Sequence, residues 1–154
     1  MADLSRATAL LQQLGPVMEP DAIRLHGEDL WEVETSALTI FLQYVEAEDR
    51  FTLYAELTIP ASSDRTAVLE LLLANNSQFM ATGGVRMALS EPQGDAIMMV
   101  DLALEKLDVQ QLQAVLQNFI EKHAYWKLAI GSVQQEAEET ITSNEHIAAE
   151  MFRV

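Results

Sequence analysis

The sequence predicts an α+β fold in one domain, with the element order α-β-β-β-α-β-β-α and a C-terminal tail. This prediction depends on the spacing of the apolar residues. They recur with the 3.6-residue period of a helix near both ends and in the middle of the chain, and with the two-residue period of a strand in the two stretches between. The chain of 154 residues is also about the size of one domain. We expect a twisted antiparallel sheet packed by helices over residues 1–130, and an acidic tail, partly helical or disordered, over residues 131–154.

The first half of the chain contains one predicted helix and three predicted strands. Apolar residues share one helical face from Leu4 to Leu14, and Gly15-Pro16 follows where the helix is expected to end. Apolar and polar residues then alternate in three segments, of which the last two form a predicted hairpin: Trp31–Thr35, Ile40–Val45 and Phe51–Leu57.

The second half contains two predicted helices and two predicted strands. A helix is expected over residues 65–80, with Ser62-Ser63-Asp64 as N-cap candidates and Gly83-Gly84 at its end. Two strands follow, Val85–Ser90 and Ala96–Leu104, and then a helix that Asp108 opens and that keeps the 3.6-residue period to Ile130.

Two of these elements carry more apolar surface than a helix or strand with one face in solvent would carry. The helix over residues 65–80 is apolar on more than one side, and both alternating sets of the strand Ala96–Leu104 are apolar. A sheet sandwiched between helices would bury this surplus within one chain. A dimer interface, together with a groove for an apolar or amphipathic peptide, would bury it against partners. The pattern leaves both explanations open.

The charge of the chain excludes several classes of partner. The chain has nine Lys and Arg residues and 24 Asp and Glu residues, a formal net charge of −15. Few basic side chains are therefore available to bind phosphate backbones or anionic lipid. No apolar run approaches the roughly 18 residues of a membrane span, and the N-terminus lacks the pattern of an export signal. The absence of cysteine excludes disulfides and thiolate chemistry. We expect a cytoplasmic protein without nucleic-acid or membrane partners.

Nothing in the sequence indicates catalysis, a metal or a cofactor. His26 lies in a predicted turn, His123 on the apolar face of the last helix and His146 in the tail, and none has the orienting third group that a catalytic triad requires. Glu28 and Asp29 beside His26 have the composition of a solvated turn. We expect His123 to be a packed histidine with one hydrogen-bond partner.

Five features occur in a fixed order between about residues 4 and 130. They are a leucine-rich first helix ending in Leu14-Gly15, the hairpin Thr39–Leu57, the segment Leu71-Leu72-Leu73-Ala74-Asn75-Asn76, the pair Gly83-Gly84 before two strands, and a long last helix with Phe119 and Trp126. In their order and spacing, and in its small size and acidity, the chain resembles the class I chaperones of bacterial type III secretion, the Tir-chaperone (CesT-like) family.

This resemblance implies a non-enzymatic homodimer of the bacterial cytoplasm. Such a dimer holds the N-terminal segment of a secreted effector non-globular and secretion-competent, and its further partners include the secretion ATPase or a regulator. The dimer contact is implied at the second helix and the following strand, here Leu71, Leu72, Phe79, Val85, Met87 and Leu89. By analogy, the cargo patches are expected at Leu10, Leu14, Ile40, Leu42, Met98 and Val100.

Two other functions stay open at this point. A regulatory adaptor on the same fold would sequester a small partner protein instead of delivering an effector. A small α+β enzyme would need a pocket in which His26 or His123 meets a carboxylate.

Overall fold

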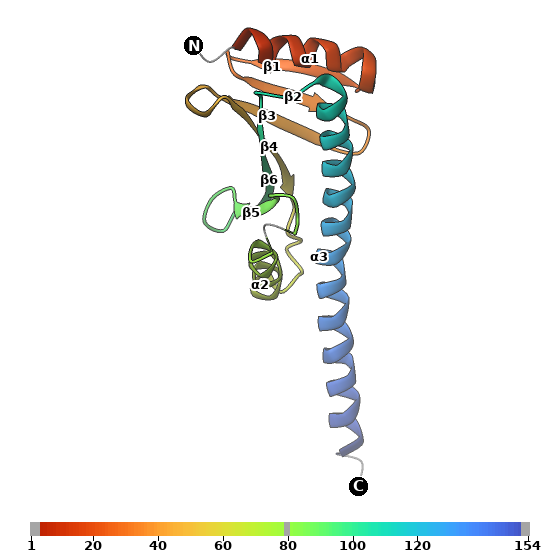
Figure 1. Ribbon diagram of the computed structural model, residues 1–154. Helices are drawn as coiled ribbons and strands as arrows, with labels where there is room; N and C mark the ends of the chain where they lie inside the picture. The colour runs from red at the N-terminus through yellow and green to blue at the C-terminus, as the bar shows by residue number, and fades with distance from the viewer. Residues whose placement is uncertain (1–3, 79–80, 152–154) are drawn as a thin grey trace.

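The computed structural model describes residues 4–78 and 81–151, with side chains as far as Val133. At its centre is a six-stranded antiparallel sheet in the order β1-β2-β3-β4-β6-β5 (Figure 1). The described residues form three α-helices besides this sheet. The predicted α+β class and antiparallel sheet are therefore confirmed, with one strand more than the sequence indicated.

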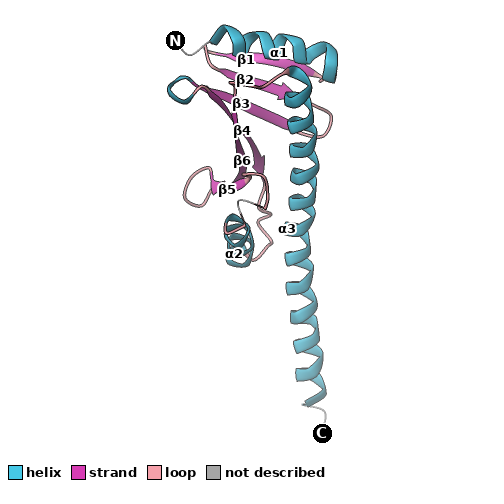
Figure 2. Cartoon of the chain, viewed as in Figure 1, coloured by secondary structure: helices cyan, strands magenta, loops and turns pink. Residues whose placement is uncertain are grey.

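The elements stack from α1 at one end of the sheet to α2 at the other, and α3 runs alongside (Figure 2). In chain order they are α1 (Leu4–Met18), β1 (Ala22–His26), β2 (Leu30–Glu34), β3 (Thr39–Val45), the short 3₁₀ helix η1 (Glu46–Glu48), β4 (Arg50–Leu57), α2 (Arg65–Asn76), β5 (Arg86–Leu89), β6 (Ala96–Ala103) and α3 (Val109–Met151).

The additional strand is β1, which pairs with β2 along its whole length. His26, which the sequence placed in a turn, is the last residue of β1 and lies opposite Leu30. The turn itself begins at Gly27, whose φ of 69° is a conformation that glycine adopts without strain. The strand escaped prediction because Ile23 and Leu25 are its only large apolar residues, too few to establish a period of two.

The three helices end at other residues than their patterns predicted. α1 continues through Pro16 to Met18, and Glu19 then stops the helix in the left-handed region with φ 50°. α2 ends at Asn76 rather than at residue 80. α3 passes through Gly131 and continues to Met151, over the segment predicted to be a tail.

The N-termini of α2 and α3, by contrast, lie where the sequence indicated. Asp64 accepts a hydrogen bond from the Ala67 N–H at 3.1 Å, which satisfies one of the free donors of the first turn of α2. Asp108 accepts from the Gln111 N–H at 2.7 Å, and the Gln111 side chain accepts from the Asp108 N–H at 3.0 Å. This reciprocal pair is a capping box, and it fixes the start of α3.

One face of the sheet holds the hydrophobic core. Trp31, Leu42, Leu53 and Val100 lie opposite one another on four neighbouring strands, and all four are buried. α1 and α3 pack together against this core, and the Gln113 side chain donates a hydrogen bond to the carbonyl at the end of α1. The opposite face, which we call the open face, consists of the alternate residues of the same strands. None of its residues on the six strands is buried.

Candidate partner-binding surfaces

The six residues predicted to contact cargo lie inside the single chain, which corrects that assignment. Four are fully buried, and the other two expose 5% and 9% of their surface: Leu14, Ile40, Leu42 and Met98, then Leu10 and Val100. Those on strands belong to the alternate set that faces the helices. Because the side chains of a strand change face at every residue, an error of one position moves the whole set from the outside to the core. The candidate contacts are therefore their neighbours on the open face and the rim of α1.

A groove of about 380 Å³ lies between α1 and the β1–β2 hairpin. Its lining is mostly apolar and consists of Thr8, Leu11, Gln12, Gly15, Ile23, Leu25 and Trp31. Leu11 and Trp31 are buried, whereas 52% of Leu25 is exposed. Leu25 therefore offers apolar surface to a partner at the rim of the groove.

The groove runs beside an unpaired sheet edge. β1 is the terminal strand of the sheet, and no other described residue makes a backbone hydrogen bond to it from outside. An extended peptide that paired with β1 would place alternate side chains over the groove, since side chains of a strand alternate between its faces.

The open face carries a strip of three apolar side chains across its middle, which we call the central strip. Phe41, Tyr54 and Met99 lie directly opposite one another on β3, β4 and β6. The rings of Phe41 and Tyr54 are stacked, with centroids 5.3 Å apart and planes at 19°. Partial burial raises the pKa of the Tyr54 hydroxyl, which stays neutral at physiological pH. The strip is a half-exposed apolar surface with its aromatic rings already ordered.

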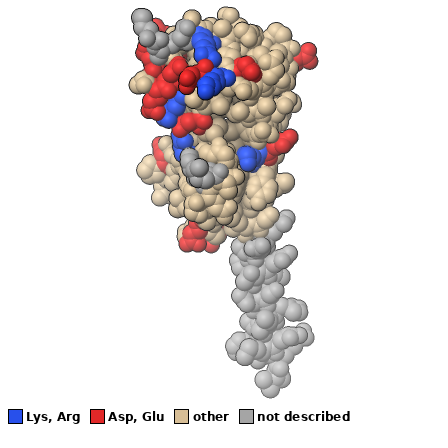
Figure 3. All heavy atoms as spheres, in the orientation of Figure 1, with Lys and Arg blue, Asp and Glu red and all other residues tan. Residues whose placement is uncertain are grey.

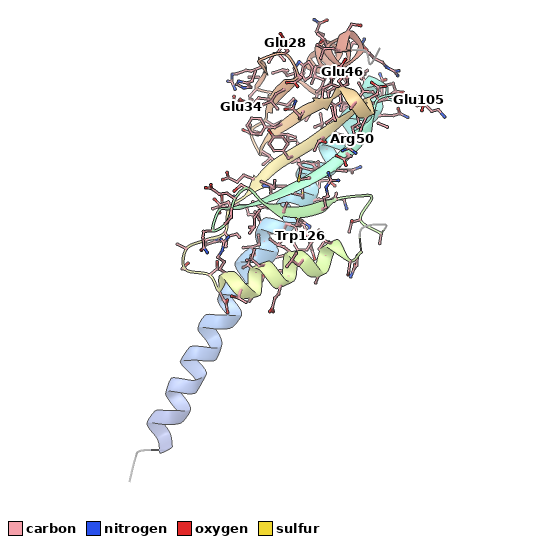
Figure 4. All side chains as sticks on the ribbon, turned by 90° about the vertical axis from the view of Figure 1, so that its left-hand side faces the viewer. Glu28, Glu34, Glu46, Arg50, Glu105 and Trp126 are labelled. Carbon is pink, nitrogen blue, oxygen red and sulfur yellow. The ribbon has the colours of Figure 1, made fainter. Side chains whose placement is uncertain are left out.

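Ion pairs flank the central strip on the side of β1 and β2. Arg24 Nη1 lies 2.6 Å from Glu32 Oε1 and 2.6 Å from Glu34 Oε2, and His26 Nε2 lies 2.6 Å from Glu32 Oε2. The hydrogen bond with His26, together with Arg24, holds the pKa of Glu32 below its usual value. Glu34 and Arg50 mark two sides of the open face in Figure 4, in which α3 lies behind the sheet.

A second ionic cluster flanks the strip on the side of β5. Arg86 holds the Asp101 carboxylate through two hydrogen bonds of 2.7 and 3.1 Å, Thr52 donates to it at 2.8 Å, and Arg50 Nη1 lies 3.3 Å away. These partners lower the pKa of Asp101, and the hydrogen bonds from Arg86 have the largest effect. Charged side chains also gather towards the β3–β4 turn, while most of the remaining surface in the view of Figure 3 is uncharged.

The predicted dimer contact forms an apolar patch between α2 and β5. A shallow hollow of about 110 Å³ is lined by Leu69, Leu72, Leu73, Met87, Ala88 and Leu89, which we call the α2–β5 patch. Leu73 and Leu89 expose 65% and 38% of their surface. Of the predicted residues, Leu72, Val85 and Met87 are buried within the chain, Leu71 is half-buried, and Phe79 lies outside the described residues. Leu69 and Leu73 belong to the same apolar run and were not singled out.

The family model for the Tir chaperone protein (CesT) family matches residues 9–127, which is most of the chain. The chain belongs to the Tir chaperone (CesT) family. The resemblance seen in the sequence is thereby confirmed, and with it the prediction of a type III secretion chaperone rather than an enzyme. No curated protein matches the chain.

Solved structures of other secretion chaperones share the fold of this CesT-family chain. The crystal structure of the ExsC–ExsE complex contains a chain with TM-score 0.73 and 14% identity, covering 84% of this chain and 97% of that one. The HopA1–SchA chaperone–effector complex gives TM-score 0.69 and 17% identity, covering 82% and 97%. The ExoU–SpcU complex from Pseudomonas aeruginosa gives TM-score 0.56 and 18% identity, covering 77% and 93%.

His26 and His123 each contact a residue of a strand in this CesT-family fold, whereas the side chain of His146 lies outside those described. His123 Nε2 lies 2.6 Å from the carbonyl oxygen of Glu56, which confirms the prediction of one hydrogen-bond partner. His26 pairs with Glu32 on the open face. No group of three His, Asp or Glu side chains suited to a metal occurs among the residues whose side chains are described. No helix in the described part of the chain is long and apolar enough to cross a bilayer.

Proposed function

We propose that this chain is a homodimeric chaperone of the bacterial cytoplasm, and that it holds the N-terminal segment of a type III secreted effector in an extended state. The observation that carries the proposal is the unpaired edge of β1 beside the groove under α1. Strand addition supplies backbone hydrogen bonds that do not depend on the cargo sequence, and the groove selects alternate side chains. The neighbouring structures are complexes that contain ExsE, HopA1 and ExoU, which supports a protein partner for this chain.

The central strip is the second contact that we propose for cargo. It is apolar, half-exposed and ordered by ring stacking, and each of its ends meets a fixed ionic cluster. A cargo chain that continues from β1 around the sheet would cover these rings with its own apolar side chains. The large wrapped area offsets the entropy lost when a disordered segment becomes ordered.

The α2–β5 patch is the proposed dimer contact. An exposed Leu73 and a half-exposed Leu89 flank a hollow whose lining is nearly all apolar. Two copies that pack these patches together remove the exposed leucines from water, at about 25 cal/mol for each Å² of apolar surface buried. In such a dimer the β1 edges of both copies belong to one particle, so that one long effector segment can bind along both edges.

The cargo proposal is tested by co-expression with a type III secreted effector of the same bacterium. Limited proteolysis of the purified complex is expected to trim the effector's N-terminal region to a protected fragment on the order of tens of residues. Leu25→Asp is expected to weaken binding by at least about tenfold, because it places a charge at the rim of an apolar groove.

Leu128→Asp provides the matched control for Leu25→Asp. Leu128 is another exposed leucine, 74% accessible, and it lies on α3 outside the groove. An effector that stays globular and uncut in the complex would contradict the proposal, as would an equal loss of binding in both variants.

The dimer proposal is tested by the solution mass from light scattering at micromolar concentration. We expect about 34 kDa, twice the 17.2 kDa of one chain. Leu73→Asp should give the monomer mass, since two buried carboxylates would face each other across the contact. Ala74→Asp places the same charge one position along α2, outside the α2–β5 patch, and should remain a dimer. A monomeric parent protein would refute the proposed contact.

A further inference from the structure

The sheet has a second terminal strand, β5, whose edge differs from that of β1. The side-chain amide of Asn76 forms two hydrogen bonds with the backbone of Met87: Asn76 Nδ2 donates to the Met87 carbonyl at 3.0 Å, and the Met87 N–H donates to Asn76 Oδ1 at 2.8 Å. The amide of Asn76 thus offers one donor and one acceptor, as the backbone N–H and C=O of a residue on a neighbouring strand would. The amide of Asn76 therefore takes the place of a strand at this position.

The hydrogen-bond direction identifies which groups of β5 face outwards. In an antiparallel pair, the N–H and C=O of one residue point to the same side, and successive residues alternate between the two sides. Since Met87 is paired with α2, its backbone groups point away from β6, as do those of Val85 and Leu89. The Val85 carbonyl also accepts a hydrogen bond, from Thr82 Oγ1 at 3.2 Å. A strand that approached β5 would find the Val85 carbonyl and both backbone groups of Met87 occupied.

We propose that Asn76 closes the edge of β5 and thereby restricts strand addition to the edge of β1. Unpaired edges accept foreign strands readily, and natural proteins block the edges that are not in use. Because both outward groups of Met87 are occupied, β5 contributes its side chains to the α2–β5 patch, and two copies cannot pair their β5 strands through Met87. The assignment of cargo to β1 rests on the proposed function, whereas the closure of β5 does not.

The first measurement needs no variant and uses the chain alone. Residue-resolved amide hydrogen exchange by NMR compares two outward N–H groups of the same edge, Met87 and Leu89. The Met87 N–H has a partner in Asn76, and no hydrogen bond from the Leu89 N–H to another described element occurs. We expect Met87 to exchange about fivefold to tenfold more slowly than Leu89, the effect of one hydrogen bond. Equal exchange rates, each corrected for its intrinsic rate, would overturn the proposal.

The second measurement opens the edge with Asn76→Ala. The chain contains no cysteine, so a single Ala88→Cys can report whether two β5 strands meet. If two copies pair through the outward groups of Met87 and Leu89, the two positions 88 lie opposite each other at a distance that a disulfide can span. We expect a mild oxidant to cross-link Asn76→Ala/Ala88→Cys and not the Ala88→Cys parent, and sedimentation velocity to show added self-association in Asn76→Ala.

Asn75→Ala is the matched control, because it removes the same amide one position earlier and Asn75 makes no hydrogen bond to β5. It should behave like the parent in both assays. Asn76→Ala without cross-linking or added self-association would overturn the proposal, and so would equal cross-linking in the parent. Should Asn76→Ala fail to fold by circular dichroism, the exchange comparison of the unaltered chain still decides the matter. Neither measurement involves cargo, so failure of the cargo proposal would leave these outcomes unchanged.

Discussion

Asp101 connects three strands of the open face through its own carboxylate. It lies on β6 and binds Arg86 of β5 as well as Thr52 and Arg50 of β4. Arg86 and Thr52 donate hydrogen bonds to the ionised form and the charge of Arg50 attracts it, so the folded chain holds the pKa of Asp101 below the ordinary value of 3.8. A group whose pKa is lower in the folded state binds fewer protons there than in the unfolded state. Its stabilising effect is complete above the unfolded pKa and disappears as the pH falls through the folded pKa.

Asp101→Asn tests this linkage. The variant keeps the size of the side chain but loses the charge, so the parent should unfold at a higher urea concentration than the variant at pH 7 and at pH 5. Below about pH 4 the difference should shrink, since the parent carboxylate then becomes protonated. Urea unfolding at pH 7, 5 and 3 measures the effect.

Asp21→Asn is the comparison for Asp101→Asn, because Asp21 is exposed in the turn before β1. Its midpoints should follow those of the parent at all three pH values. A difference between Asp101→Asn and the parent that is constant from pH 7 to pH 3 would show that the carboxylate charge contributes nothing.

At the residue scale, the sequence identified which strands are apolar but not which residues face outwards. In β6 both alternating sets are apolar, so Met98 and Met99 look equivalent in the sequence. The structure buries Met98 in the core and places Met99 on the open face. The distinction depends on the register of β6 against β4, a non-local property that the local pattern does not contain.

At the element scale, strong local signals predicted the structure well and weak ones did not. The N-caps of α2 and α3 are side-chain hydrogen bonds within three residues, and both were found in the sequence. The short β1 lacks such a signal and is held mainly by its pairing with β2. Since β1 forms both the open edge and one wall of the groove, the missed strand is also the part of the candidate site that the sequence could not supply.

The length of α3 gives a prediction at the same scale. Gly131 lies inside this helix, and a Cβ added there would meet no atom within 4 Å. Gly131→Ala should therefore stabilise the protein by about 0.5–1 kcal/mol, because alanine loses less backbone entropy in a helix than glycine does. Gly83→Ala is the contrast: its φ of 69° is unfavourable for alanine, so it should destabilise the protein although space is free. Thermal unfolding compares the three proteins, and a destabilised Gly131→Ala would contradict a helix through this position.

On the scale of the whole molecule, charge and apolar surface are segregated. Residues 19–64, which include β1 to β4, contain 11 acidic and 2 basic residues, a net charge of −9. Residues 65–130, which contain α2, β5 and the α2–β5 patch, have a net charge of only −2. This arrangement leaves the proposed contact between copies nearly neutral and puts the negative charge where cargo is proposed to bind. It favours basic cargo and keeps a particle with exposed apolar surface in solution.

The same segregation determines how salt should act on the dimer. Two copies of net charge −15 repel each other, whereas the α2–β5 patch that we propose joins them is nearly all apolar. Raising NaCl from about 0.01 M to about 0.15 M shortens the screening length from about 30 Å to about 8 Å, so the dissociation constant of the dimer should fall several-fold. Ala74→Asp adds one charge per copy beside the patch and should steepen this dependence. Sedimentation equilibrium measures both proteins, and a dimer that weakens with salt would mean that ion pairs hold it together.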